Sequence, residues 1–443
     1  MIKKSFYIIL ASSTLLASFD VESAWQKVQS HNQGIKASIS EVYGAKQKQY
    51  SAKSMYLPNI SLSGSYTHLD KPIDIDTSDI ASLMALFNIP FPNSIDLSKK
   101  DIFMADLQLL WPLYTGGKID AAQDVYAAKV NESEAKLQMK KDKEFLTLIK
   151  LYYGSVVAKS LYTTRQEAQK ALAHHYENAK KLKQEGQIAK VELLNAQVKL
   201  DAAKIETTKA KHNYEIVLGA LERLTGSSIH PSNTLFIADI YKNEQAYKKA
   251  TSHYNGLKVF DTKEKQASAL IKVKKADYYP SVTGFGNYNL YRDESLLMQS
   301  MPNWFVGVVV HFNILQRTDR AQEIRIAKAT RDKVRFLKAE ALENLKTLSE
   351  KTYKEMIASS EEFYALDSSL ELAKENYKLR SLSFKEGLAT SSDVIDAQLF
   401  LQSIRTKRLN AAYTFVQKFA QLFVLTGERE QFFRALKDVT PLK

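Results

Sequence analysis

Four stretches of the chain alternate apolar with polar or small residues, and long stretches of helical spacing separate them. Alternation at a period of two predicts strands, here at about 57–69, 102–114, 280–291 and 303–315. In the first of these, Ile60, Leu62 and Tyr66 alternate with serine and threonine. Each stretch covers about ten residues, which is the length of a tilted strand that spans a membrane.

The stretches that follow the second and fourth strands are rich in Ala, Lys, Glu and Leu and contain no proline. They predict four helices, at about 118–184, 190–225, 319–385 and 391–426. A helix of 67 residues, such as 118–184, is about 100 Å long, whereas globular helices average about 11–12 residues. A glycine, Gly186 or Gly387, separates the two helices of each pair, which predicts two αα-hairpins.

The two halves of the chain form an internal two-fold repeat. Glu386 follows Glu185 by 201 residues, and Gly427 follows Gly226 by 201 as well. Before the strand-connecting loop the spacing between the copies is 222, so the first copy has 21 extra residues between its strands. The repeats cover 18–226 and 254–427, with a connector at 227–253 and a C-terminal tail at 428–443. We expect a helix or broken helix at 24–55 and a long loop at 70–100.

The N-terminus combines a basic start, a short apolar run and a small-residue exit, which is typical of a secretory signal peptide over 1–17. The alternative is an ordinary buried first helix. The chain has no cysteine, which excludes disulfides, thiolate metal sites and an acylated N-terminal cysteine. No later run of about 18 apolar residues follows, so we expect any membrane contact to be made by strands.

The formal net charge is +13, which raises the question of nucleic acid as a partner. Lys and Glu alternate along the long Ala-rich segments, a pattern more typical of solvated helix faces, and we expect no nucleic-acid partner. The eight histidines show no HExxH-type spacing. His174 and His175 are adjacent on a helix and so point apart, and no phosphate-binding glycine loop is present. We therefore expect no enzyme activity, no metal and no cofactor.

Four strands cannot close a membrane barrel by themselves, because even the smallest spanning barrels need about eight and lipid tolerates no unpaired strand edge. Three chains would supply twelve strands. The predicted fold class is an α+β membrane protein, with a trimeric 12-stranded β-barrel (four strands per chain) continued by a long antiparallel α-helical barrel. The strands alone are also compatible with a half-buried sheet in a soluble domain, and the helices alone with a coiled-coil tether.

The chain resembles the TolC-like outer-membrane efflux proteins over nearly its whole mature length. The most specific pieces are Tyr56, Leu57 and Pro58 before the first strand, the exit WPLYTGG at 111–117, and the helical tips at 185–186 and 385–397. The resemblance implies a homotrimer in the lipid of the Gram-negative outer membrane that spans into the periplasm, with a periplasmic adaptor (membrane fusion) protein and an inner-membrane transporter as partners. The second copy departs from the pattern, with FNILQR at 312–317 in place of the Gly-Gly exit.

Acidic residues near the second helical tip are candidates for a pore gate. Asp393 and Asp396 are three residues apart on a predicted helix and so share a face, and a three-fold assembly would stack them as two acidic rings that favour cations. The first copy has Glu192 and Asn195 at these positions. Asp393 has an alternative role, because acids near a helix N-terminus also complement its dipole.

Two further groups of residues are candidates for contacts with a partner or with lipid. The candidate turn and adaptor-contact residues are Gly186, Gln187, Ile188, Gly387, Leu388 and Ala389. The candidate membrane-interface aromatics are Tyr66, Trp111, Tyr288 and Trp304.

The sequence thus predicts the passive exit duct of a tripartite efflux or type I secretion system. The alternative is a structural coiled-coil envelope protein without a conducting lumen. Drug efflux, protein secretion and metal efflux are not separated by these residues.

Overall fold

The computed structural model of the chain describes residues 18–239, 242–315 and 318–437. The expected signal peptide at 1–17 lies outside these residues. So do positions 316–317 of the second strand exit and 438–443 of the expected tail.

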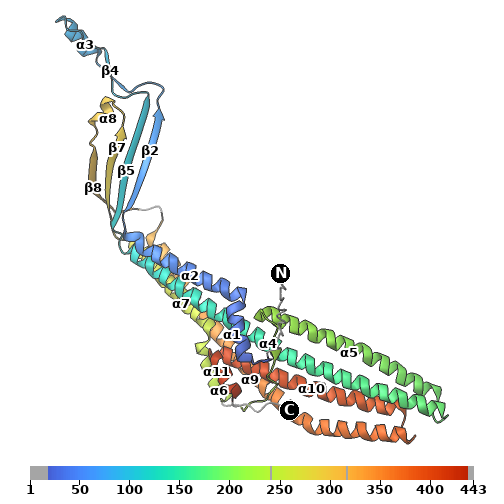
Figure 1. Cartoon of the computed structure of the whole chain (residues 1–443). Coiled ribbons are helices and arrows are strands. Elements are labelled where there is room, and N and C mark those ends of the chain that lie inside the picture. The colour runs from blue at the N-terminus through green and yellow to red at the C-terminus, as the bar shows by residue number, and fades with distance from the viewer. Residues whose placement is uncertain (1–17, 240–241, 316–317, 438–443) are drawn as a thin grey trace, which may run out of the picture. The chain divides into compact units, whose positions relative to one another are not determined.

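Helices dominate the described residues, and short strands interrupt them (Figure 1). The helices are α1 Val21–His31, α2 Gln33–Lys53, α3 Ser78–Ala85, α4 Lys118–Gln184, α5 Lys190–Thr225, α6 Glu244–Ala250, α7 Asn255–Ala276, α8 Leu296–Ser300, α9 Arg320–Lys385, α10 Ser391–Leu425 and α11 Arg429–Lys437, with 3-10 turns η1 Ser54–Tyr56 and η2 Thr251–His253. The strands are β1 Ser18–Phe19, β2 Asn59–His68, β3 Asp74–Asp76, β4 Ser94–Asp96, β5 Asp101–Tyr114, β6 His230–Pro231, β7 Ser281–Arg292 and β8 Trp304–His311.

The chain divides into two units. The first, the helical unit, comprises Met1–Val42, Ser133–Phe260 and Leu337–Lys443, and the second, the strand unit, comprises Tyr43–Glu132 and Asp261–Phe336. Both copies of the repeat contribute to each unit, so each unit combines segments that are far apart in the sequence.

The strand unit contains a four-stranded antiparallel sheet in the order β2-β5-β7-β8. The register pairs Tyr66 with Phe103 and Tyr288 with Trp304. Among the described residues, β2 and β8 each pair along one edge only. The sheet therefore ends in two open edges.

The sheet separates apolar from polar side chains, as the alternation predicts. Its apolar face is exposed in the single chain: Leu62 is 69% exposed, Val306 is 70% exposed and Val308 is 61% exposed. A face this apolar, left uncovered by the chain itself, needs lipid or another protein surface to cover it.

The long loop expected at 70–100 contains short regular elements that the sequence pattern did not predict. Strands β3 and β4 pair there as a short antiparallel ladder, and α3 follows β3. Thr77 fixes the junction, because its backbone N–H donates to the carbonyl of Asn93 (2.9 Å) and its hydroxyl donates to the carbonyl of Pro92 (2.6 Å). Such side-chain bonds at a turn are not readable from a hydrophobic pattern.

The helical unit is organised around an aromatic core at the middle of α4 and the C-terminal half of α10. Phe145 packs edge-on against Trp25 of α1 and Phe432 of α11, with ring centroids 5.6 and 5.4 Å apart. All three side chains are at most 2% exposed. From this core the hairpins α4–α5 and α9–α10 run side by side to their glycine turns (Figure 1).

A helix or broken helix was expected over 24–55, and the structure has the broken form, with the break at Asn32 between α1 and α2. The Asn32 carbonyl oxygen of the side chain accepts from the Ile35 N–H (3.0 Å), and its amide donates to Glu144 of α4 (3.1 Å). Asn32 thus begins α2 and fixes it to the core, which accounts for the break. No helix of the described residues is both long and apolar enough to cross a membrane.

Candidate functional site

The two hairpin ends of the helical unit hold most of the site residues predicted from the sequence. At each end a glycine has a positive φ, +77° for Gly186 and +72° for Gly387. The following residue donates its N–H five residues back, Gln187 to the Leu182 carbonyl and Leu388 to the Ser383 carbonyl, both at 2.8 Å. This is the Schellman ending of a helix, in which glycine avoids the steric penalty of the left-handed conformation.

Asp393 forms a capping box with Thr390 at the start of α10. The Thr390 hydroxyl accepts from the Asp393 N–H (3.2 Å), and the Asp393 carboxylate accepts from the Thr390 N–H (2.8 Å). The Thr390 hydroxyl also lies 2.7 Å from the Asp393 carboxylate, and this hydrogen bond, with that from the Thr390 N–H, lowers the pKa of the Asp393 carboxyl, so it is ionised at neutral pH. The Asp393 side chain therefore makes the helix-capping contacts that its alternative role requires.

Asp396 lies one turn further along α10 and its side chain is exposed. In the first hairpin the corresponding residue, Asn195, is exposed as well. Glu192 differs from both, because its carboxylate accepts from the backbone N–H of Ser391 (3.1 Å) in the other hairpin. Of the four gate candidates, Asp396 and Asn195 are the two whose side chains are exposed.

A buried histidine joins the two hairpins beside these residues. His175 of α4 is 6% exposed, its Nε2 lies 2.5 Å from the hydroxyl of Ser391, and its ring packs 4.4 Å from that of Phe384 in α9. Burial lowers the pKa of His175 to about 4, so the ring is neutral at pH 7. Ser391, which is fully buried, is thus held by α4 through its hydroxyl and by α5 through its N–H.

The sequence pattern alone does not predict this cluster. His174 and His175 are adjacent on a helix and so are not expected to share a metal, and no pattern singles out Ser391. The helical phase of His175, which is shared with the buried Leu172 and Ala179, is the one signal that could have identified it.

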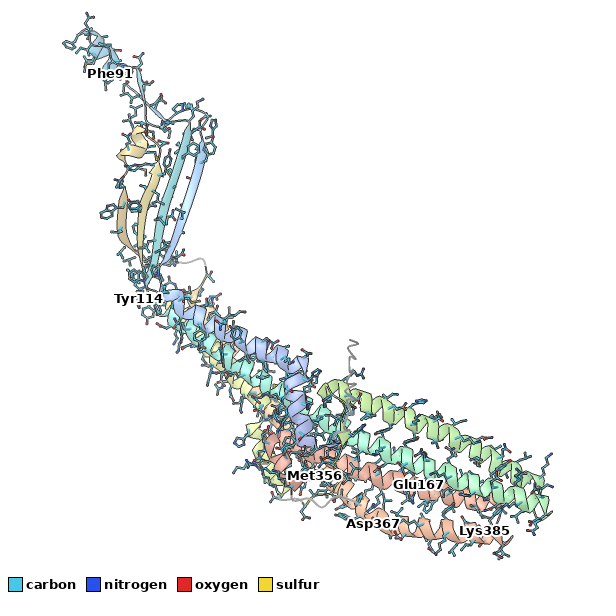
Figure 2. All side chains as sticks on the ribbon, viewed as in Figure 1. Phe91, Tyr114, Glu167, Met356, Asp367 and Lys385 are labelled. Atoms are coloured by element: carbon cyan, nitrogen blue, oxygen red, sulfur yellow. The ribbon has the colours of Figure 1, made fainter. Side chains whose placement is uncertain are left out.

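The predicted adaptor-contact residues lie at the ends of the hairpins and are largely exposed. Leu388 is 82% exposed, whereas Ile188 and Ala389 are half-buried against the small core formed by Ala179, Ala196, Phe384 and Val394. Lys385, the last residue of α9, marks this end of the unit in Figure 2. Leu388 is therefore the one large apolar side chain of the two turns that is left open to a partner.

The strand unit carries a second candidate site, a polar ladder across the sheet. Asp106 of β5 accepts from the Ser63 hydroxyl of β2 (2.8 Å) and from the Asn287 amide of β7 (2.9 Å). The three residues lie on the face opposite to the exposed apolar side chains. The sequence predicted this alternation but did not single out Asp106 as its centre.

The four predicted interface aromatics lie on the exposed sheet. Tyr66 is near the end of β2, Trp304 begins β8, and Trp111 is near the end of β5 that leads to α4. The Trp111 indole N–H donates to the carbonyl of Tyr56 (3.0 Å). All four side chains are exposed: Tyr66 59%, Trp111 44%, Tyr288 51% and Trp304 61%.

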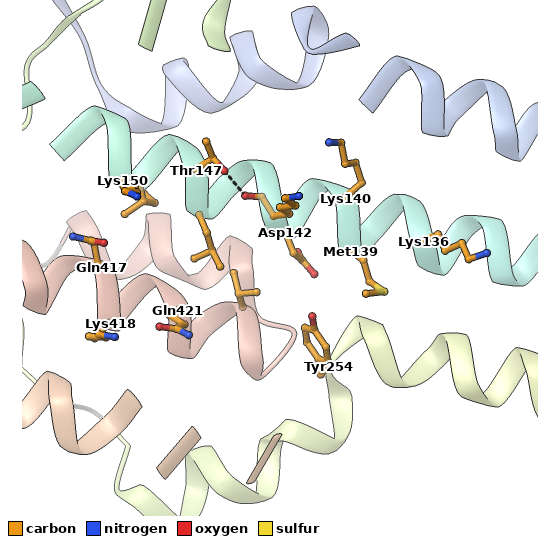
Figure 3. Close-up of a pocket in the computed structure, with 14 residues that line it drawn as sticks. Lys136, Met139, Lys140, Asp142, Thr147, Lys150, Tyr254, Gln417, Lys418 and Gln421 are labelled. Carbon is orange, nitrogen blue, oxygen red and sulfur yellow. Dashed lines mark hydrogen bonds between the residues drawn. The ribbon is translucent and has the colours of Figure 1, made fainter. Parts of the chain in front are cut away.

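A cavity of 740 Å³ lies in the helical unit beside α4, α10 and Tyr254 (Figure 3). Three of its charged lining residues form ion pairs: Lys140 with Glu144 at 2.6 Å, Lys418 with Glu355 at 2.7 Å, and Asp142 with Arg429 at 2.8 Å. Burial raises the pKa of the Asp142 carboxyl, and the Arg429 guanidinium opposes this. The described residues contain no group of three metal-ligating side chains.

Comparison with known families matches the chain to the outer membrane efflux protein family over residues 14–227 and 246–428. No curated protein matches the chain.

Solved structures with the same fold cover nearly the whole chain. That of CusC, described in terms of transmembrane channel formation, is 13% identical, and the match covers 95% of each chain with a TM-score of 0.76. The outer membrane protein VceC from Vibrio cholerae is 14% identical, with 91% of this chain and 96% of that chain covered and a TM-score of 0.73. The Campylobacter jejuni outer membrane channel CmeC is 15% identical, with 94% and 88% covered and a TM-score of 0.72. These similarities confirm the predicted fold class, strands continued by long antiparallel helices.

Proposed function

Because the chain belongs to the outer membrane efflux protein family, we propose that it forms a homotrimeric duct that passively conducts substrates from an inner-membrane transporter to the outside. The chain is a protein of the Gram-negative outer membrane that extends into the periplasm.

The observation that carries this proposal is the two-faced, open-edged sheet. Its apolar face is exposed, its opposite face holds the Asp106 ladder, and β2 and β8 leave one edge each unpaired in the described residues. In lipid both open edges must find hydrogen-bond partners. Pairing β2 of each chain with β8 of the next closes a 12-stranded barrel from three chains, with the apolar face toward lipid and the polar ladder inside.

The long helices also expose apolar side chains that the single chain does not cover. On α5 the exposed apolar residues Val191, Leu194 and Val198 follow a three-four spacing, and on α9 Leu372, Leu379 and Leu382 follow a seven-three spacing. Stripes of this period are covered by knobs-into-holes packing against another helix. We infer that α5 of one chain packs beside α9 of the next, which builds a helical barrel.

The hairpin turns would close the periplasmic end of this barrel. Asp396, exposed on α10, is proposed to line the closed end and to favour cations, with Asp393, Glu192 and Asn195 beside it. The exposed Leu388, with Gly186, Gln187, Ile188, Gly387 and Ala389, is proposed to contact a periplasmic adaptor protein. The energy for transport then comes from the inner-membrane transporter that the adaptor holds, and no catalysis is assigned to this chain.

A coiled-coil envelope protein without a lumen is the competing function. It accounts for the long helices but leaves the exposed apolar strands and the Asp106 ladder without a role. The two functions differ in oligomer and in phenotype. We expect the purified chain to run as a trimer that heating converts to monomer, and its deletion to sensitise the host to a transported compound. A purified chain that has formed its strands but stays a monomer or dimer in mild detergent would contradict the duct.

A further inference from the structure

The 21 residues that the first copy has and the second lacks form an ordered hairpin with an apolar end. Residues Ile80 to Ile95 include no charged residue, a run of sixteen. This end, the apolar tip, exposes six large side chains: Ile80 46%, Leu83 56%, Leu86 81%, Phe87 70%, Ile89 51% and Phe91 36%. Exposed apolar side chains gathered at such density mark a contact surface.

The stem below the tip is fixed by hydrogen bonds. β3 and β4 pair from Asp74–Asp96 to Asp76–Ser94, and the Ile73 carbonyl accepts from the N–H of Leu97 (2.6 Å). The Ser98 hydroxyl accepts from the Ile73 N–H (2.9 Å). Among the described residues of the strand unit, α3 stands beyond the ends of β2 and β5, and Phe91 lies at its far end (Figures 1 and 2).

We propose that the three apolar tips of the trimer meet over the channel axis and seal its external mouth, so that the occupant of this surface is the same surface of the other two copies. This inference rests on the proposed trimer. It assigns to the inserted hairpin a closure of the barrel that the strands form.

The charges of the stem favour another copy over a lipid surface as the partner of the apolar tip. Outside the tip, the residues from Leu69 to Lys100 carry five acids and three lysines, a net charge of −2. The acids are Asp70, Asp74, Asp76, Asp79 and Asp96, and the lysines are Lys71, Lys99 and Lys100. An acidic stem is repelled by anionic headgroups, whereas the uncharged tips can approach one another without repulsion between like charges.

The position of the hairpin also favours contact with another copy over contact with lipid. Tyr66 and Phe103, whose rings lie 4.8 Å apart at the end of β2 and β5, suit the membrane interface. The stem begins just beyond them, so the tip lies past the lipid. The hairpin also leaves the sheet through the edge strand β2, so in a closed barrel each copy rises next to a subunit boundary.

The stem is long enough to reach the axis. Twelve strands spaced about 4.8 Å apart close a wall of roughly 10 Å radius. The eight residues from Leu69 to Asp76, of which Asp74–Asp76 form β3, would span up to roughly 25 Å at about 3.3 Å per residue if fully extended. Three tips can therefore meet at the centre without any change in the strands.

The experiment uses the full chain, which has no cysteine of its own, in outer-membrane vesicles. Phe87→Cys should be joined to a second copy by a flexible bis-maleimide, giving a dimer band on a denaturing gel. Lys100→Cys, at the base of the same hairpin, is the matched control and should not be joined. Both variants must first show the heat-modifiable trimer, because its loss would count against the proposed duct and not against the seal.

A second measurement tests closure. A bulky thiol reagent added from outside should label Ser65→Cys, on the polar face of β2, at least tenfold faster when Leu86→Asp and Phe87→Asp are added. Intact trimers with no Phe87→Cys cross-link and an unchanged labelling rate would overturn the seal. So would quenching of a Phe87→Trp variant by brominated lipid, which would place the tip in the membrane surface.

Discussion

The ring of His175 in α4 and the hydroxyl of Ser391 at the first turn of α10 lie 2.5 Å apart in the interior of the helical tip. This contact joins the hairpin of the first copy to that of the second. Glu192 from α5 also holds Ser391, and Asp393 of α10 and Arg380 of α9 lie 4.0 Å apart beside it. The start of α10 is thus fixed by groups from both copies.

The buried histidine predicts that the tip loses stability in acid. Burial lowers the pKa of His175 to about 4, against about 6.5 in an unfolded chain. Above pH 6.5 the ring is neutral in both the folded and the unfolded state, so protonation of His175 does not reduce the free energy of unfolding. As the pH falls from 6.5 to 4 the unfolded state binds the proton first, so the tip is destabilised by up to roughly 3 kcal/mol.

Hydrogen exchange of residues at the tip as a function of pH measures this effect. His175→Gln should flatten the dependence between pH 6.5 and 4, whereas His174→Gln, at the exposed neighbouring position, should leave it intact. An unchanged pH profile in His175→Gln would show that other groups control the acid response.

The turn glycine of the second hairpin should be irreplaceable for docking. Gly387 has φ +72°, and no atom lies within 4 Å of the position that a Cβ would take, so Gly387→Leu is penalised first by the left-handed backbone conformation, by about 1–2 kcal/mol. We expect this variant to remain trimeric and to lose cross-linking to its adaptor by at least tenfold. Gly44→Leu, in a helix with open space around it, is the control and should cross-link normally. Wild-type cross-linking in Gly387→Leu would contradict the assignment of the turn as the contact.

The pair of Arg429 and Asp142 should matter for folding of the helical unit. Arg429 lies 2.8 Å from the carboxylate of Asp142, which is 3% exposed, and its guanidinium lies 5.2 Å from the Trp25 ring. Arg429→Ala leaves a buried carboxylate without its charge partner, which costs about 3–5 kcal/mol. Thermal unfolding followed by helical circular dichroism should show this loss, and Asp142→Asn added to Arg429→Ala should recover part of it. Equal melting of Arg429→Ala and the native chain would mean that Asn255, which also donates to Asp142 (2.9 Å), suffices.

Asp396 predicts the ion preference of the closed end. Replacing it with Asn removes one charge per chain from an exposed position near the turns, so the ratio of cation to anion permeability should fall several-fold. Asp201→Asn, an exposed acid paired with Lys204 further along α5, is the control and should leave the ratio unchanged. If the two variants behave alike, the acidic ring lies elsewhere.

Periodicity made the long elements predictable. A period of two located the strands that the structure places at β2, β5, β7 and β8, and proline-free helical composition located α4, α5, α9 and α10. Their lengths, repeated at fixed offsets, also pointed to the fold. Both signals sum over many residues, and for that reason single substitutions do not obscure them.

The features that were not predictable depend on single contacts between distant segments. The Asn32 break, the Thr77 junction and the His175–Ser391 contact each rest on one side chain that meets a partner 112, 15 or 216 residues away. Nothing in the local pattern distinguishes His175 from an exposed histidine except its phase on α4. Asp393 shows the same limit, because its spacing predicted a shared face with Asp396 but not its capping box with Thr390.

Single-channel recording of the purified full-length chain in a planar lipid bilayer shows whether the trimer is a conducting duct. We expect discrete, stepwise currents that appear only with the trimer, most readily when Leu86→Asp and Phe87→Asp open the proposed external seal, and a reversal potential that favours cations in a salt gradient. Trimers that insert into the bilayer and give no current at any voltage or pH, even when Leu86→Asp and Phe87→Asp remove the proposed external seal, would contradict the duct.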